Sequence, residues 1–156
     1  MPLAIPQTSI RISLNQIAFA DCLEQLKEIS GIELVELRNE STPGFCDHYV
    51  FAERKNEPWA KAFSEFITTS NFPLEFLSDK GYLEFPSPEE GDVAAYFTRA
   101  ELGTVKRLFT HWGIYEHGKV TSRFGSSSIF RHSIEVVPQI YGDEATFLRK
   151  IPKETE

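Results

Sequence analysis

A tight turn at residues 117–118, His-Gly, is the feature of this sequence that most constrains its fold. It separates two runs of residues that favour extended structure, residues 109–115 and 119–124. Two such runs joined by a short polar turn that contains glycine predict an antiparallel β-hairpin. The chain must therefore place these two strands side by side in a sheet.

The length of this turn decides which side chains share a face of the hairpin, because a slip of one residue moves every side chain to the other face. With a turn of two residues, Glu116 pairs with Lys119, and Ser122 projects on the same face as His111. The opposite charges of Glu116 and Lys119 favour this register. A loop of three residues would instead turn the neighbours of Ser122 toward His111, namely Thr121 and Arg123.

The remaining pattern predicts a single α+β domain over residues 1–156, with a helix-rich part at 1–90 and a β-rich part at 91–150. Residues 93–97 and 144–149 read as strands that accompany the hairpin. The helix-rich part combines helical spacing with several extended stretches. Its predicted strands are 9–17 and 32–37, its predicted helices are 19–29 and 58–67, and 74–85 is expected to be extended or hairpin.

The charge of the chain excludes some classes of function. There are 16 Lys and Arg against 23 Asp and Glu, which gives a net charge of -7 and no basic run. Nucleic-acid binding needs clustered basic residues, and a negative field slows encounter with anionic cell-wall polymers. Neither a secretory leader nor an apolar run of membrane length is evident. We therefore expect a cytoplasmic protein without nucleic-acid or membrane partners.

The two cysteines lie in different settings. Cys22 falls on the apolar face of a predicted helix, where a free cysteine usually serves as a small core residue. Cys46 follows a turn-rich segment and precedes Tyr49 and Val50 at helical spacing. This spacing predicts that Cys46 lies at or near a helix N-terminus, where the peptide dipoles favour a thiolate. Cys46 is therefore the better candidate nucleophile.

Several motifs after Gly91 occur in a specific order. Gly-Asp followed by an apolar strand occupies 91–97, and His-Trp-Gly-Ile-Tyr occupies 111–115. The further segments that belong to this ordered pattern are 118–120, 122–125, 130–132, 141–144 and 147–149. This arrangement resembles the NlpC family of cysteine peptidases and amidases. The resemblance implies a papain-like fold in which helices pack on a mainly antiparallel central sheet.

The same resemblance implies a catalytic set for this sequence. The family's catalytic histidine falls on His111, its cysteine on Cys46, and its variable polar third member on Ser122. His132 is an alternative third member, because it could approach from the segment after the sheet. The chain departs from the family at Phe45, since the family usually has Asp or Asn immediately before the cysteine.

The implied function is a cysteine hydrolase that cleaves an amide bond in a peptide or related substrate. One alternative keeps the fold without the chemistry: a binding module in which Phe45 marks the loss of an active nucleophile. Another is that residues 10–85 form a domain similar to the short N-terminal domain of secretins. No spacing typical of a metal site or of a phosphate-binding loop occurs, so we expect neither a metal nor a cofactor.

Overall fold

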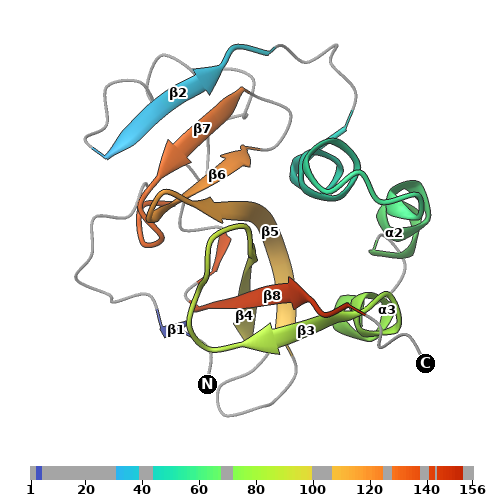
Figure 1. The fold of residues 1–156 in the computed structure, drawn as a ribbon. Helices are drawn as coiled ribbons and strands as arrows, with labels where there is room; N and C mark the ends of the chain where they lie inside the picture. Colours follow the sequence, from blue (N-terminus) through green and yellow to red (C-terminus); the bar gives the residue numbers. More distant parts are fainter. Residues whose placement is uncertain are drawn as a thin grey trace.

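The fold is an α+β arrangement, as predicted, in a computed structural model (Figure 1). Within the described residues, eight strands form one sheet in which every pairing is antiparallel. The structure describes residues 3–4, 31–38, 44–67, 72–99, 107–124, 128–137, 141–142 and 144–152. The statements below concern these residues.

The strands are β1 (Leu3–Ala4), β2 (Ile32–Glu36), β3 (Tyr82–Phe85), β4 (Val93–Arg99), β5 (Arg107–Glu116), β6 (Lys119–Arg123), β7 (Ile129–His132) and β8 (Glu144–Lys150). Their order in the sheet is β1-β8-β4-β5-β6-β7-β2, and β3 also pairs with β8. Residues 93–97 of β4 are all buried, so this central strand is covered on both faces. That explains why its sequence is continuously apolar and does not alternate.

The hairpin between β5 and β6 has the two-residue turn that the charges of its ends favour. Glu116 pairs with Lys119, and both turn residues have positive φ, 54° at His117 and 75° at Gly118. Two consecutive residues with positive φ are typical of the type I′ turn, whose twist matches that of the flanking strands. The alternative register with a three-residue loop is therefore wrong.

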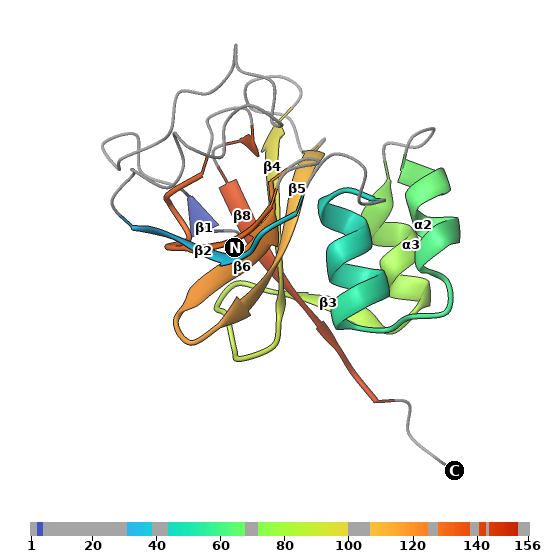
Figure 2. The same cartoon turned by 90° about the horizontal axis from the view of Figure 1, so that it is seen from above.

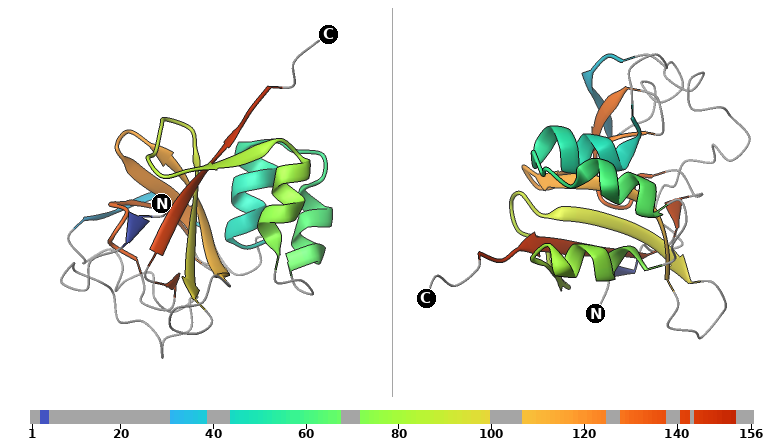
Figure 3. Two further views of the ribbon diagram at one scale, coloured as in Figure 1. Left: turned by 90° about the horizontal axis from the view of Figure 1, so that it is seen from below. Right: turned by 90° about the vertical axis from the view of Figure 1, so that its right-hand side faces the viewer.

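Three helical segments cover one side of the sheet (Figures 2 and 3). Cys46 and Asp47 are helical and lead directly into the π-helical segment η2 (His48–Arg54). The others are α2 (Ala60–Ile67) and α3 (Pro73–Asp79). Proline suits the first turn of α3 because its missing N–H would have no partner there. The predicted position of Cys46 at a helix start is confirmed.

Two cores lie on opposite faces of the sheet. The helix-side core is rich in aromatic residues, and the ring of Phe51 lies 5.0–5.8 Å from four others, those of Trp59, Phe63, Tyr82 and Trp112. The far-side core lies on the other face and includes Tyr96, Val120, Phe124, Phe130, Tyr141 and Phe147. Successive side chains of a strand point to opposite faces, so neighbouring residues of β5 contribute to different cores.

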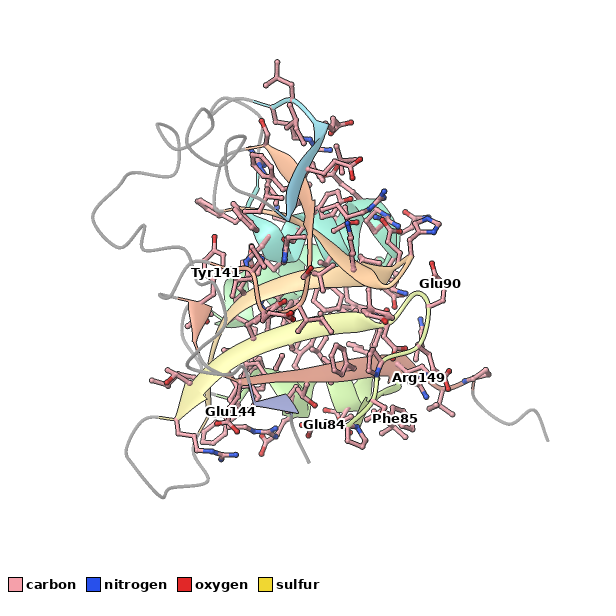
Figure 4. All side chains as sticks on the ribbon, turned by 90° about the vertical axis from the view of Figure 1, so that its left-hand side faces the viewer. Glu84, Phe85, Glu90, Tyr141, Glu144 and Arg149 are labelled. Atoms are coloured by element: carbon pink, nitrogen blue, oxygen red, sulfur yellow. The ribbon has the colours of Figure 1, made fainter. Side chains whose placement is uncertain are left out.

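The Gly-Asp motif before β4 serves the structure. Asp92 is 2% exposed and receives two hydrogen bonds of 2.8 Å from the guanidinium of Arg149 on β8. The backbone N–H of Glu89 donates to the same carboxylate at 2.8 Å. The guanidinium of Arg149 also lies over the ring of Phe85, 4.0 Å from its centroid (Figure 4). Asp92 thus fixes the start of β4 against β8 and β3.

Most predicted elements after residue 30 are confirmed, including the strands at 32–37, 93–97, 109–115, 119–124 and 144–149 and the helix at 58–67. The prediction for 74–85 is wrong in its first half, because α3 ends at Asp79 and only Tyr82–Phe85 is extended. β7 was not predicted as a strand. The predicted strand at 9–17 and the helix at 19–29, with Cys22, lie outside the described residues.

Two strands from the first 90 residues pair with strands from the β-rich part. β2 pairs with β7, and β3 pairs with β8. Both described strands of residues 10–85 therefore belong to the same sheet as the rest of the chain, which does not agree with a separate secretin-like domain there. Among the described helices, none is both long and apolar enough to cross a membrane.

Candidate active site

Cys46 lies at the start of the helical segment that contacts β5 and β6. It is partly exposed and packs against the helix-side core. Gly44, two residues earlier, has a φ of 94°, and a Cβ atom there would lie 2.6 Å from the ring of His48. Glycine therefore allows the tight entry into the helix that brings Cys46 against the sheet.

Opposing influences act on the Cys46 thiol. Burial of the sulfur and the negative charge of Asp47 raise the pKa of Cys46 to about 12. Hydrogen bonds from the backbone N–H groups of Trp112, Asp47 and Cys46 itself act in the lowering direction. Two of these groups belong to the helix start and the third belongs to β5. At neutral pH the resting group is therefore a thiol, held beside the backbone of Trp112.

Arg123 is the cation of this region. Its side chain is fully buried, and its guanidinium donates to the carbonyl oxygen of Gly44 at 2.8 Å. Burial and the nearby charge of Arg38 lower the pKa of Arg123, whereas the charge of Glu53 and, to a smaller degree, charge on Cys46 raise it. Arg123 is thus electrostatically coupled to the Cys46 sulfur and would favour a thiolate there. Arg38 itself is bound to Glu53, with a 2.7 Å bond from its Nη1 atom.

On the opposite face, three buried polar side chains form a chain of hydrogen bonds. The Nε2 atom of His111 lies 3.0 Å from the Oγ atom of Ser122, which lies 3.1 Å from the Nε2 atom of His132. The Nδ1 atom of His132 lies 2.7 Å from the carbonyl oxygen of Ser133. His111, Ser122 and His132 all have zero exposure. We call these three residues the His-Ser-His chain.

Aromatic rings enclose the imidazole of His111. The ring of Tyr141 stacks on it with centroids 3.9 Å apart and planes 4° apart, and the rings of Phe124 and Tyr96 lie 5.6 Å away. Figure 4 views the sheet from the side away from the helices and labels Tyr141. Burial and the nearby charge of His132 lower the pKa of His111 well below its usual value. The imidazole is therefore neutral at neutral pH.

Gly113 lets the two strands approach closely beside His111. A Cβ atom at this position would lie 2.5 Å from Cγ1 of Val120 and 3.0 Å from Cβ of Ser122. Real Cβ atoms do not approach that closely, so any other residue would push β6 away. The glycine of the His-Trp-Gly-Ile-Tyr motif thus allows Ser122 to reach His111.

The structure brings some predicted site residues together and keeps others apart. Ser122 meets His111 as predicted, and His132 also joins them, but from β7 within the sheet and not from a segment after it. Cys46 belongs to the helix side of β5, whereas His111 belongs to the far side. The Nδ1 atom of His111 is buried and has no hydrogen-bond partner within the described structure.

The other candidates have different surroundings. Thr121 accepts a 3.0 Å hydrogen bond from Arg131, and Arg123 faces Cys46 and not His111. His48 lies on the surface near Glu53, and His117 is an exposed turn residue. Among the residues that the structure describes, no group of three or more His, Cys, Asp or Glu side chains could hold a metal ion.

Sequence reasoning missed the neighbours of the Cys46 thiol. The hydrogen bond of the Cys46 thiol to the backbone of Trp112 and its electrostatic coupling to Arg123 come from packing between a helix start and two strands. The only sequence signal was the hairpin register, which places Arg123 on the face opposite Ser122.

No family model matches this chain, and comparisons with curated proteins and with solved structures found no match either.

Proposed function

We propose that the protein is a cysteine hydrolase of the kind that the NlpC resemblance implies, with Cys46 as the nucleophile, His111 as its base and Ser122 as the residue that orients the base. One observation carries this proposal. Nε2 of His111 is hydrogen-bonded to Ser122, and the buried Nδ1 of His111 has no partner among the described residues. The backbone N–H of the next residue, Trp112, donates a hydrogen bond to the Cys46 sulfur. The nitrogen without a partner thus belongs to the β5 residue that precedes the one whose backbone holds the thiol, on the opposite face of the strand.

The proposed reaction cleaves an amide in two steps. In the first step, Nδ1 of His111 accepts the Cys46 proton, the sulfur attacks the acyl carbon, and the carbon–nitrogen bond breaks as His111 protonates the departing amine. Water, which gives a proton to His111, then attacks the thioester; the carbon–sulfur bond breaks, the acyl group leaves as a carboxylic acid, and the proton returns to the Cys46 sulfur. The backbone N–H groups at the helix start can stabilise charge on the sulfur or on the carbonyl oxygen.

Cys46 and His111 are not hydrogen-bonded in the resting structure, because their side chains lie on opposite faces of β5. Burial favours a neutral thiol and a neutral imidazole, whereas proton transfer between them creates a thiolate and an imidazolium. The buried cation of Arg123 favours that thiolate. Because the two side chains lie on opposite faces of β5, the proposal requires a rearrangement of this strand that brings His111 and Cys46 to the same face, which is a larger change than the shortening of catalytic hydrogen bonds on substrate binding.

The substrate class follows from charge and chemistry. The chain carries a net charge of -7, so encounter is faster with neutral or basic substrates than with acidic ones. The proposed substrate is therefore a peptide or another amide without strong negative charge. Within this proposal neither a metal nor a cofactor is needed, because the nucleophile and the base are both side chains.

Selective alkylation tests the proposal without a known substrate. The protein is treated with iodoacetamide at pH 7, and peptide mass spectrometry follows labelling of Cys46 and Cys22 separately. The proposal expects Cys46 to be labelled at least ten times faster than Cys22, and expects His111→Gln to remove most of this difference. Equally slow labelling of both cysteines in the folded protein would contradict it.

A binding module is the second candidate, and two observations favour it. Burial and Asp47 raise the pKa of Cys46 to about 12, which opposes thiolate formation. An open hollow of about 530 Å³ lies at α3 and β3, and its lining includes Glu75, Asp79 and Leu148 but none of the proposed catalytic residues. A binding module predicts slow labelling of Cys46 that does not depend on His111.

A further inference from the structure

The His-Ser-His chain has one feature that fixes the direction of all its hydrogen bonds. The Nδ1 atom of His132 lies 2.7 Å from the carbonyl oxygen of Ser133. A carbonyl oxygen only accepts hydrogen bonds, so Nδ1 of His132 must carry a proton. The imidazole is buried, and burial lowers the pKa of His132 to about 4, so Nε2 of His132 carries none at neutral pH.

The proton positions along the rest of the chain follow from this anchor. Because Nε2 of His132 is an acceptor, the hydroxyl of Ser122 donates to it across 3.1 Å. A hydroxyl has one proton, so the same oxygen must accept the 3.0 Å hydrogen bond from His111. Nε2 of His111 therefore carries the proton, and its buried Nδ1 is left with a lone pair.

We propose that His132 is a positioning residue that acts through Ser122 to hold His111 in the form with a proton on Nε2 and a lone pair on Nδ1. This inference rests on the proposed function in one respect, because it states how His111 is prepared to accept the Cys46 proton. The three side chains and the Ser133 carbonyl nevertheless form this chain whether or not Cys46 reacts.

The surroundings of His111 keep this arrangement in place. The stacked ring of Tyr141 restricts rotation of the imidazole, and the absence of a side chain at Gly113 keeps Ser122 close. Exchanging the two ring nitrogens would break the bond to Ser122 and leave a buried polar group of the chain without its partner, which is unfavourable. A serine alone can donate or accept, so Ser122 does not define the tautomer; the anchored ring of His132 does.

Nitrogen NMR of the histidine rings measures the tautomers directly. Long-range ¹H–¹⁵N spectra of the full chain at pH 7.5 distinguish protonated from unprotonated ring nitrogens, and the exposed turn residue His117 supplies a reference. We expect His111 to be protonated at Nε2 only and His132 at Nδ1 only. A proton on Nδ1 of His111 in the wild-type protein would overturn the proposal.

Two substitutions of His132 separate positioning from packing. The amide oxygen of His132→Gln can accept the Ser122 proton, whereas His132→Leu keeps bulk without an acceptor. We expect the glutamine variant to keep His111 in the Nε2-protonated form, and the leucine variant to give a mixture of tautomers with about tenfold slower Cys46 alkylation, the loss expected for one hydrogen bond. An unchanged His111 tautomer in the leucine variant would contradict the inference.

The two readouts distinguish this inference from the proposed function. If His111 has the expected tautomer but Cys46 alkylates as slowly as Cys22, the hydrolase proposal fails and the positioning role of His132 stands. If Cys46 is reactive but His111 carries its proton on Nδ1, the hydrolase proposal stands and the positioning role fails. If neither variant of His132 folds, the wild-type spectrum alone decides the tautomer.

Discussion

The two faces of β5 treat polar groups differently at neighbouring residues. On the far side, the His-Ser-His chain consists of neutral groups, fully buried, each hydrogen-bonded to the next. On the helix side, Cys46 lies among charges, with Asp47 and Arg123 near its thiol. Hydrogen bonds thus fix the proton positions on the far side, whereas charges influence the ionisation of a thiol on the helix side. Strand alternation at His111 and Trp112 separates these two tasks.

Matched serine substitutions should give the largest difference between the faces. Ser122→Ala leaves the Nε2 atoms of two buried imidazoles without a partner, and we expect it to lower the free energy of unfolding by about 2–4 kcal/mol. Ser64→Ala removes one hydroxyl on the helix side, where Ser64 donates to Asp47, and should cost about 1 kcal/mol. Urea unfolding of both variants measures the difference, and equal losses would show that the far-side chain is not specially stabilising.

Mild acid should destabilise the protein through its far side. The pKa of buried His132 is lowered to about 4 from an ordinary 6.5, so its contribution is fully present above pH 6.5 and is lost as pH falls toward 4. We expect a loss on the order of 2 kcal/mol from His132 between pH 7 and pH 5, above the range where ordinary carboxylates titrate. Urea midpoints across this range measure it, with His132→Leu as the control. If the urea midpoint of His132→Leu falls with pH as steeply as that of the wild-type protein, His132 is not the group responsible.

Gly113→Ala should disturb the close approach of β5 and β6, with a smaller loss in the free energy of unfolding. The new methyl group would overlap Val120 and crowd Ser122, and such overpacking costs about 1–3 kcal/mol. Val120→Ala removes the atom nearest to that methyl group, so the double variant should lose less stability than the sum of the two single losses. Thermal unfolding of the three variants gives this coupling. Strict additivity would argue against the overlap between residues 113 and 120.

More of the contacts on the far side of the sheet than on the helix side could be predicted from the sequence. The His-Ser contact followed from one turn, because the type I′ geometry and the pairing of Glu116 with Lys119 determine which side chains share a face. The strand β7 could not be predicted in the same way, because its four residues have no turn signal that fixes their partner. His132 therefore reached the site by long-range pairing with β6 and β2.

The helix side depended on packing that a linear pattern does not contain. The spacing of Cys46, Tyr49 and Val50 predicted a helix start, and the structure confirms it. The hydrogen bond of the thiol to the backbone of Trp112 and its electrostatic coupling to Arg123 depend on how that helix lies against β5 and β6. The high thiol pKa follows from this burial and could not be predicted from local sequence. The helix α3 was missed because its first residue, Pro73, and its short length resemble a turn.

The pH dependence of Cys46 alkylation tests the central claim most directly. In a Cys22→Ala background, iodoacetamide labelling rates from pH 6 to pH 11 report the ionisation of the Cys46 thiol. If His111 serves Cys46, the rate reaches its plateau near neutral pH, well below the value of about 12 that burial and Asp47 impose, and His111→Gln moves the midpoint upward. A rate that still rises at pH 11 and ignores His111→Gln would contradict the account and favour a binding module.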